Sequence, residues 1–313
     1  MTQPPHPALF IVGPTASGKT ALAIALAQRF GGEIVNADSR QFYRGMDIGT
    51  AKPTFEERSR AVHHLVDVAE PDEACGLAWF LDHAHAAIRD IRDRGRLSII
   101  CGGTGQFIRA LLEDWQVPRV PPNPALRAEL ESRLAMAGIA PLAAELMRLD
   151  PTTAQRIDTQ NPRRVIRAIE VARADRVDAE PRAHREPLDQ RLVLGIHIDR
   201  ATLYGRIDER VDAMFDRGLV EEVRMLTADG RGCGTFAFTA IGYRQVCDFF
   251  AGNSTLEEAR SRTKLATHRL ARTQGAWFRR TDPRITWLDA GPELEKRALA
   301  VTAAFLRTTG YRE

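Results

Sequence analysis

The stretch LFIVGPTASGKTALAIAL, residues 9–26, determines the architecture that we expect of this chain. It begins with an apolar run typical of a buried parallel strand, and this run ends at Gly13-Pro14. From Lys19 onward, apolar residues recur at helical spacing until the glycine pair at 31–32. Between the two lies GPTASGKT, which matches the pattern G-x-x-x-x-G-K-[ST] in the strand–loop–helix setting that this pattern requires.

A loop of this kind binds phosphate. Its backbone N–H groups converge on phosphate oxygens, and the N-terminus of the following helix favours negative charge. Lys19 would add a mobile positive charge and Thr20 a hydroxyl ligand for Mg²⁺, so Mg²⁺ is the expected cofactor. The expected phosphate-binding residues are Gly13, Pro14, Thr15, Ala16, Ser17, Gly18, Lys19 and Thr20. The pattern leaves open whether the phosphate is transferred or departs, and a glycine-rich turn before a core helix is the structural alternative.

The rest of the chain extends this unit into an α/β fold. Further strands are expected at 33–38, 63–68, 97–103, 191–198 and 284–289, and helices at 78–95, 105–113, from 201, at 255–279 and at 292–306. Strands that alternate with helices predict a parallel sheet flanked by helices, here a core of the P-loop NTPase-like type.

A helical insertion is expected to interrupt this core. Prolines exclude regular structure at 117–126, and then only helical patterns follow, at 124–136, 140–149 and 162–174, before a polar loop at 174–189. We therefore expect a first part of the core at 1–121, an all-helical insertion at 122–189, and completion of the core with C-terminal helices at 190–313.

Composition and cysteine usage indicate a cytoplasmic globular protein. Of the 313 residues, 44% are hydrophobic and 27% charged, with a net charge of +3, which is typical of soluble domains. Cys75, Cys101, Cys233 and Cys247 form no CxxC pair, so no zinc pattern and no disulfide framework is expected. The first residues lack a signal-peptide pattern, no apolar run reaches the ~18 residues of a membrane span, and no heptad repeat predicts oligomers. We expect a monomer.

Two further residues are expected in the same crevice as the loop. The 97–103 strand ends without the acidic residue that a kinase or ATPase uses to place Mg²⁺ and water. Asp38 follows the second strand, where doubly wound sheets bind their ligands, and could bind metal or accept a proton from a nucleophile. Thr104 follows the fourth strand. The structural alternatives are that Asp38 caps a turn and that Thr104 only caps the next helix.

Basic residues concentrate in two stretches. Arg163, Arg164 and Arg167 lie close together in one predicted helix, and RSRTKLATHRLARTQGAWFRR at 260–280 adds Trp277 and Phe278 to a basic run. Positive charge beside aromatic stacking surface is typical of RNA-binding surfaces, although each run could be only a solvated helix face.

Several blocks together resemble the tRNA dimethylallyltransferases, also called tRNA isopentenyltransferases. They are DSRQFYRGMDIGTAKP (38–53), HHLVDVAEPDEA (63–74), CGGTGQFIRALL (101–112), DPTTAQRIDTQNPRRVIRAIEV (150–171), RVDAMFDRGLVEEV (210–223), AIGYRQ (240–245) and THRLARTQGAWFR (267–279). The resemblance spans about 9–279. Because the eukaryotic members add a C-terminal zinc finger and no cysteine pair follows here, we expect a bacterial-type member.

The resemblance implies transfer of a dimethylallyl group from dimethylallyl diphosphate to N6 of the adenosine 3′ of the anticodon, in tRNAs reading codons that begin with U. The loop would then hold a departing diphosphate, assisted by Arg210, while Asp38 acts as general base and Thr104 bonds near the adenine. It further implies contacts with the tRNA anticodon stem-loop by Asp38, Ser39, Arg40, Gln41, Thr104, Arg127, Arg163, Arg164, Arg167, Thr239, Gly242, Tyr243, Arg244, Arg272, Gln274, Trp277 and Arg279. In this family pattern His268 and Thr273 stand where basic residues are expected.

Three other functions remain compatible with the loop. A small-molecule kinase would consume ATP, and an adenylate isopentenyltransferase would use a free nucleotide as acceptor. A non-catalytic, nucleotide-binding RNA switch would need neither Asp38 nor Thr104 for its activity.

Overall fold

The computed structural model describes residues 6–121, 123–174, 188, 190–228 and 232–311. It divides into two compact units: a core unit, Met1–Trp115 with Glu186–Glu313, and a helical unit, Gln116–Arg185. The limits expected for the insertion, 122 and 189, fall outside the described residues, as does most of the expected loop at 174–189. The two units are therefore described separately.

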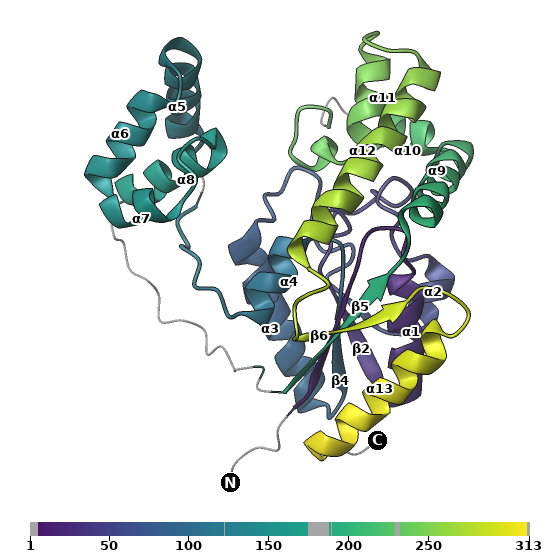
Figure 1. Cartoon of the computed structure of the whole chain (residues 1–313). Coiled ribbons are helices and arrows are strands. Elements are labelled where there is room, and N and C mark those ends of the chain that lie inside the picture. Colours follow the sequence, from purple (N-terminus) through teal and green to yellow (C-terminus); the bar gives the residue numbers. More distant parts are fainter. Residues whose placement is uncertain (1–5, 122, 175–187, 189, 229–231, 312–313) are drawn as a thin grey trace. The chain divides into compact units, whose positions relative to one another are not determined.

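A six-stranded parallel sheet forms the centre of the core unit (Figure 1). Its strands are β1 (Ala8–Val12), β2 (Gly32–Asn36), β3 (His63–His64), β4 (Leu97–Cys101), β5 (Arg191–His197) and β6 (Ile285–Asp289). Their order is β3-β2-β4-β1-β5-β6, and each neighbouring pair is parallel. Every residue of β1 and β4 is buried, as expected for apolar strands covered on both faces. The predicted α/β class is confirmed.

Helices cover both faces of this sheet. The helices α1 (Lys19–Phe30) and α13 (Leu294–Thr309) bury their apolar sides with Leu9, Ile99 and Ile196 in one cluster. On the other face lie α3 (Leu77–Asp93) and α4 (Gly105–Leu112), whose Phe80 and Phe107 rings stack 4.5 Å apart. The short α2 (Phe55–Arg60) begins with a Thr54 capping box that the sequence pattern did not lead us to expect.

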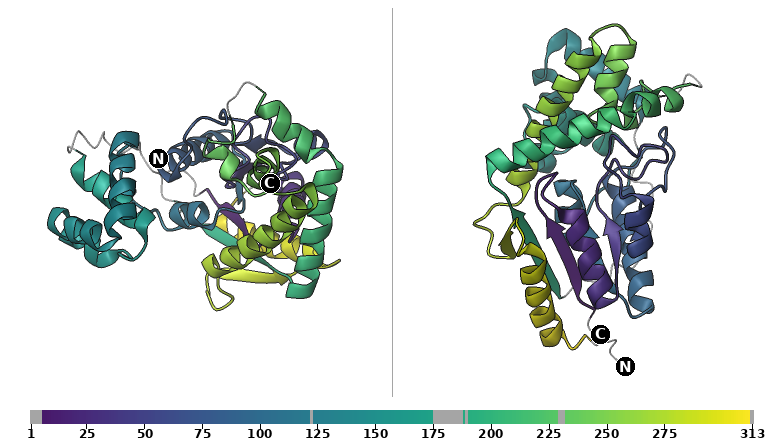
Figure 2. Two further views of the ribbon diagram at one scale, coloured as in Figure 1. Left: turned by 90° about the horizontal axis from the view of Figure 1, so that it is seen from above. Right: turned by 90° about the vertical axis from the view of Figure 1, so that its right-hand side faces the viewer.

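A second group of helices stands at the carboxyl end of the sheet (Figures 1 and 2). It consists of α9 (Arg200–Asp216), α10 (Leu219–Leu226), the 3₁₀ turn η1 (Ala237–Thr239), α11 (Tyr243–Phe250) and α12 (Leu256–Trp277). Acidic residues one turn apart on α9 pair with basic residues of α12: Asp208 with His268 at 2.9 Å, Asp212 with Lys264 at 2.8 Å, and Asp216 with Arg260 at 3.0 Å. Part of the basic run at 260–280 is therefore used to pack α12 on α9.

The helical unit has its own small core. It contains α5 (Pro124–Ala137), α6 (Ala140–Leu149), α7 (Pro151–Arg156) and α8 (Pro162–Arg173). Asn123, Asp150 and Asn161 cap α5, α7 and α8, each just before a proline at the first helical position. Leu130, Leu142, Leu146, Val165 and Ile169 are fully buried against one another.

The third strand is much shorter than the sequence predicts. Strand pairing stops after His64, because Leu65 and Asp67 adopt φ values of 60° and 56°, which a strand does not allow. The apolar pattern of 63–68 instead buries Leu65 and Val66 in an irregular turn. The expected strand over this range is wrong beyond its first two residues.

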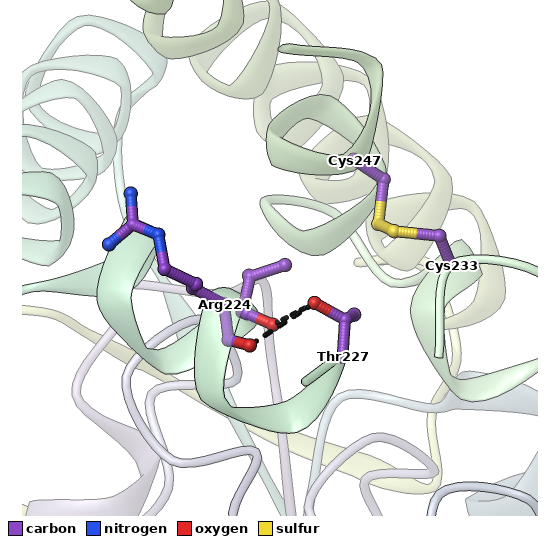
Figure 3. The surroundings of a disulfide bond; sticks show 5 residues. Arg224, Thr227, Cys233 and Cys247 are labelled. Carbon is purple, nitrogen blue, oxygen red and sulfur yellow. Dashed lines mark hydrogen bonds between the residues drawn. A yellow bond between two sulfur atoms is a disulfide. The ribbon is translucent and has the colours of Figure 1, made fainter. Parts of the chain in front are cut away.

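The expectation of no disulfide is also wrong. Cys233 and Cys247 are joined, with Cα atoms 5.8 Å apart (Figure 3). The chain turns back between them through η1, which brings the loop after α10 to α11. Near the end of α10, the Thr227 hydroxyl donates to the Val223 carbonyl at 2.9 Å. Cys75 and Cys101 are free and buried. In the described part of the chain, no helix has the length and apolar character of a membrane span.

Candidate active site

A cavity of about 570 Å³ lies at the carboxyl end of the sheet. The turns that follow β1, β2 and β4, three adjacent strands, contribute residues to it. Residues from α9, the η1 segment and α12 also line it, together with residues 49–51 and Glu57 of α2. The neighbours of β1 in the sheet are β4 on one side and β5 on the other, so the strand order reverses at β1. Ligands of open α/β sheets bind in the crevice at such a point.

The turn after β1 has the backbone of a phosphate-binding loop. Gly13 and Gly18 have φ values of 149° and 97°, which residues with a Cβ rarely adopt. Gly18 precedes α1 without a side-chain cap, so the first N–H groups of the helix stay available to an anion. Lys19 Nζ donates to the Pro14 carbonyl at 2.7 Å, and the buried Ser17 hydroxyl has no hydrogen-bond partner among the described residues. Both side chains border the cavity.

Asp38 lies in the turn after β2 and faces the same cavity. One carboxylate oxygen, Oδ1, accepts the Arg40 N–H at 3.0 Å, so the side chain does cap a turn. The other oxygen, Oδ2, is directed toward Gly103 in the turn after β4. Burial raises the pKa of Asp38, and the N–H groups of Arg40 and Gly103 with the charge of Lys19 offset this only in part. A carboxylate with a raised pKa is a stronger base.

Lys19 shows the opposite shift. Burial lowers the pKa of its ammonium group to about 8, and the nearby charge of Asp38 counteracts this. The Cys101 thiol, buried beside both groups, has a pKa raised to about 11 and is therefore neutral. Burial also lowers the pKa of Arg210 on α9, but a guanidinium remains protonated at any physiological pH. The charged residues that line the cavity are thus two acids, Asp38 and Glu57, and three bases, Lys19, Arg40 and Arg210.

Thr104 joins the turns after β2 and β4. Its hydroxyl accepts the Ser39 N–H at 3.0 Å and lies 3.2 Å from the Ser39 hydroxyl, while its own N–H donates to the Ala37 carbonyl at 3.1 Å. Although Thr104 precedes α4, its side chain makes no capping bond to that helix. Its position at the cavity is therefore not that of a simple helix cap.

Two glycines allow these turns to approach each other. A Cβ atom on Gly103 would lie 2.8 Å from Asp38 Oδ2 and 2.7 Å from Gln274 Nε2. A Cβ atom on Gly105 would lie 2.4 Å from the indole of Trp277, whose side chain borders the cavity. The segment CGGTG thus brings β4, Asp38 and α12 into contact.

Comparison with known proteins shows the family of this chain. Residues 41–281 match the model of the IPP transferases, and residues 7–64 that of the isopentenyl transferases. The tRNA dimethylallyltransferase of Roseiflexus sp. (strain RS-1) is 46% identical over 301 residues, covering 96% of this chain and 99% of that protein. This chain belongs to the tRNA dimethylallyltransferase family. The enzyme from Thermomicrobium roseum is 50% identical, covering 90% of this chain and 86% of its own.

A solved structure of the family shares the fold. The tRNA isopentenylpyrophosphate transferase of Bacillus halodurans superposes with a TM-score of 0.71 at 35% identity, covering 97% of this chain and 98% of that one. The P-loop-type core predicted from the sequence therefore agrees with the family fold. The family match also favours the tRNA transferase over the kinase and the free-nucleotide enzyme.

Among the residues expected to bind tRNA, one group borders the cavity of this family member. Its members are Asp38, Ser39, Arg40, Gln41, Thr104, Thr239, Gln274 and Trp277. Arg40 also stabilises the wall of the cavity, because its guanidinium donates to the Phe236 carbonyl at 2.8 Å and to the Thr239 hydroxyl at 2.9 Å. The exposed ring of Phe236 packs against the same guanidinium, 4.5 Å from its centre. Sequence reasoning did not identify Phe236.

A second group of the residues expected to bind tRNA does not line the cavity, and its members are either buried or exposed. Gly242 and Tyr243 are buried, whereas Arg244, Arg272 and Arg279 are exposed. The Tyr243 hydroxyl donates to the buried carboxylate of Glu222 at 2.5 Å. Glu222 also accepts the backbone N–H groups of Asp47, Ile48 and Gly49, at 3.1, 2.8 and 3.3 Å. It therefore holds the segment that leads to the cavity residues 49–51. No pattern in the sequence pointed to Glu222.

The remaining expected residues lie in the helical unit. Arg163 and Arg164 are exposed near the start of α8. Arg127 and Arg167 both contact the buried carboxylate of Glu170, at 2.7 and 3.5 Å, and Arg167 also donates to the Val120 carbonyl at 2.7 Å. These two arginines thus support the core of the unit in addition to any role with tRNA.

Proposed function

We propose that this chain transfers the dimethylallyl group of dimethylallyl diphosphate to N6 of the adenosine 3′ of the anticodon, in tRNAs that read codons beginning with U, and releases diphosphate. We further propose that it acts as a monomer in the cytoplasm, where its tRNA substrate is found. One observation carries the proposal: a carboxylate with a raised pKa and a phosphate-binding loop border the same cavity in a member of this family.

The Asp38 carboxylate can act as the base that the adenine nucleophile needs. The exocyclic amine of adenine is a weak nucleophile because its lone pair is delocalised into the ring. As N6 forms a bond to C1 of the allyl group, the C1–O bond breaks and diphosphate leaves with the electron pair. Asp38 accepts the proton that N6 loses, a contribution of about 10²–10⁴-fold to the rate.

The phosphate-binding loop can stabilise the charge of the diphosphate leaving group. The phosphate-binding loop, Lys19 and Arg210 line the cavity, and their N–H groups and positive charges would stabilise the negative charge that develops on diphosphate. Mg²⁺ fits the donors present if Thr20 supplies one ligand and the diphosphate oxygens with water supply the others, as is usual for this ion. No group of three or more His, Cys, Asp or Glu side chains among the described residues forms a protein-only metal site. When bound, the ion would supply further charge stabilisation to the leaving group.

The acceptor must reach this cavity from a folded anticodon loop. Asp38 lies inside the crevice, so the adenine has to leave its stack at a cost of a few kcal/mol. Contacts elsewhere on the RNA would offset this cost. We propose that the exposed Arg163 and Arg164 of the helical unit and the exposed Arg244, Arg272 and Arg279 of the core unit bind backbone phosphates.

The test is a transfer assay with labelled dimethylallyl diphosphate and Mg²⁺, with unmodified tRNA, AMP and ATP as alternative acceptors. We expect label on tRNA alone, and loss of transfer with retained tRNA binding in Asp38→Ala. Label on AMP or ATP would assign the chain to the free-nucleotide enzymes. Consumption of ATP with small hydroxylated metabolites and no prenyl transfer would identify a kinase, and would overturn the proposal.

A further inference from the structure

Gln274 connects two loops that lie far apart in the sequence. Its Oε1 accepts the Thr15 N–H at 2.7 Å, and its Nε2 donates to the Gly103 carbonyl at 2.8 Å. Both partners are backbone groups of fixed polarity, so the orientation of the amide is determined. Gln274 is 6% exposed, so these two hydrogen bonds lie in a poorly hydrated environment.

The two partners belong to the two halves of the proposed reaction site. Thr15 is part of the phosphate-binding loop after β1, which would hold the leaving diphosphate. Gly103 lies beside the carboxylate of Asp38, the proposed base, and its N–H lowers the pKa of that group. Two hydrogen bonds therefore connect Thr15 through Gln274 to Gly103, which lies next to Asp38.

We propose that Gln274 is a positioning residue that fixes the spacing between the diphosphate loop and the general base. The inference rests on the proposed roles of that loop and of Asp38. Family resemblance alone implies that Gln274 contacts tRNA, but both polar ends of its amide are already occupied inside the protein.

The rate of the proposed reaction depends on the spacing between the diphosphate loop and Asp38. Displacement at C1 of the allyl group requires the attacking nitrogen and the departing oxygen to lie on opposite sides of one carbon atom. The nitrogen is held near Asp38 and the oxygen near the loop, so their separation depends on how these two loops are held. A displacement of about 1 Å in such an arrangement costs roughly 10²-fold in rate.

Gln274→Met tests the link by removing both hydrogen bonds at nearly constant volume. We expect the single-turnover rate on an anticodon stem-loop to fall by about 10²-fold. The Kd of inorganic pyrophosphate should rise, because Thr15 loses the partner that orders the loop, while the Kd of the stem-loop stays as in the unmodified protein. The matched control is Gln28→Met, the same change at an exposed glutamine of α1, which should leave all three values unchanged.

Gln274→Glu provides a readout that loss of structure alone would not give. The glutamate can still accept the Thr15 N–H but cannot donate to Gly103, and it adds a negative charge beside Asp38. The pKa of Asp38 should therefore rise, and the acid limb of the rate profile should move to higher pH. This variant decides the question if Gln274→Met does not fold.

Two results would overturn the inference. One is a weaker stem-loop Kd in both variants with an unchanged pyrophosphate Kd and an unmoved acid limb, which would make Gln274 a tRNA contact. The other is an unchanged rate and unchanged affinities in both variants. If the unmodified protein transfers no prenyl group, the proposed function itself fails, and the pyrophosphate Kd of Gln274→Met still tests the link to the loop.

Discussion

At the scale of single residues, burial moves the pKa values of Asp38 and Lys19 toward each other. The pKa of the carboxylate is raised, and that of the ammonium group is lowered to about 8. Each group becomes harder to charge because the cavity is poorly hydrated. Both must nevertheless be charged in the proposed reaction, one to accept a proton and the other to bind diphosphate.

The kcat/KM for dimethylallyl diphosphate should therefore have two limbs. It should rise with pH as Asp38 loses its proton, over a range above that of an ordinary aspartate. It should fall as pH increases through about 8, because Lys19 then loses the charge that attracts diphosphate. Steady-state kinetics from pH 5 to 10 measure both limbs. Lys19→Arg should remove the alkaline limb, since a guanidinium keeps its charge, and an alkaline limb that persists in this variant would contradict the assignment.

Tyr243→Phe should lower stability more than tRNA affinity. The Tyr243 hydroxyl is buried and donates to Glu222, which holds the N–H groups of residues 47–49. Removing this donor leaves a buried carboxylate with one unsatisfied position, at a cost of about 1–3 kcal/mol in the free energy of unfolding. Urea denaturation measures this cost, and a filter-binding titration measures the tRNA affinity. A large loss of affinity at unchanged stability would show instead that the hydroxyl contacts RNA.

At this scale, the sequence predicts residues at the ends of strands better than contacts between residues far apart along the chain. Lys19, Asp38 and Thr104 stand at the ends of recognisable strands, so their common crevice follows from the parallel sheet. The family resemblance named Gln274 only as a tRNA contact, because its bonds to Thr15 and Gly103 join residues 259 and 171 positions apart. Glu222 likewise binds the N–H groups of residues 47–49, which lie more than 170 positions away. Only the folded chain brings these contacts together.

At the scale of elements, helices and strands with a clear apolar period were predicted with nearly correct bounds, whereas short elements were not. The strands β1, β4 and β5 and the helices α1, α6 and α12 lie within about two residues of their expected bounds. The six-residue helices α2 and α7 are too short to produce a clear apolar period and escaped separate prediction. The Cys233–Cys247 bond was missed because 14 residues of sequence separation do not indicate that a loop returns on itself.

This disulfide should stabilise the segment that carries η1. Cys233 and Cys247 close a loop of 14 residues, for which the loss of chain entropy in the unfolded state predicts about 3 kcal/mol. Cys247→Ser should therefore lower the free energy of unfolding under oxidising conditions, and match the unmodified protein in the presence of dithiothreitol. Thiol titration in denaturant should find two free thiols in the oxidised protein, those of Cys75 and Cys101. Equal stability of both proteins without reductant would refute a stabilising role.

At the scale of the whole molecule, positive charge matters by its position and its partners. The net charge is only +3, and many arginines are paired inside their own unit. In the helical unit, Glu170 and Glu145 bind four of them: Arg127, Arg167, Arg133 and Arg173. Arg163 and Arg164 are instead exposed near the start of α8. They are the residues of this unit that we expect to bind RNA phosphates.

Arg163→Ala combined with Arg164→Ala should weaken tRNA binding without affecting the core unit. Each phosphate contact contributes about one unit to the slope of log K against log salt, so the slope should fall by about 2. The pyrophosphate Kd should not change, since that ligand binds the loop after β1 in the other unit. Arg148→Ala with Arg156→Ala is the matched control, because it removes the same charge from exposed positions of α6 and α7. If both pairs reduced the affinity and the salt slope equally, the helical unit would attract tRNA only by its overall charge. A loss confined to the first pair would place the RNA backbone at the start of α8.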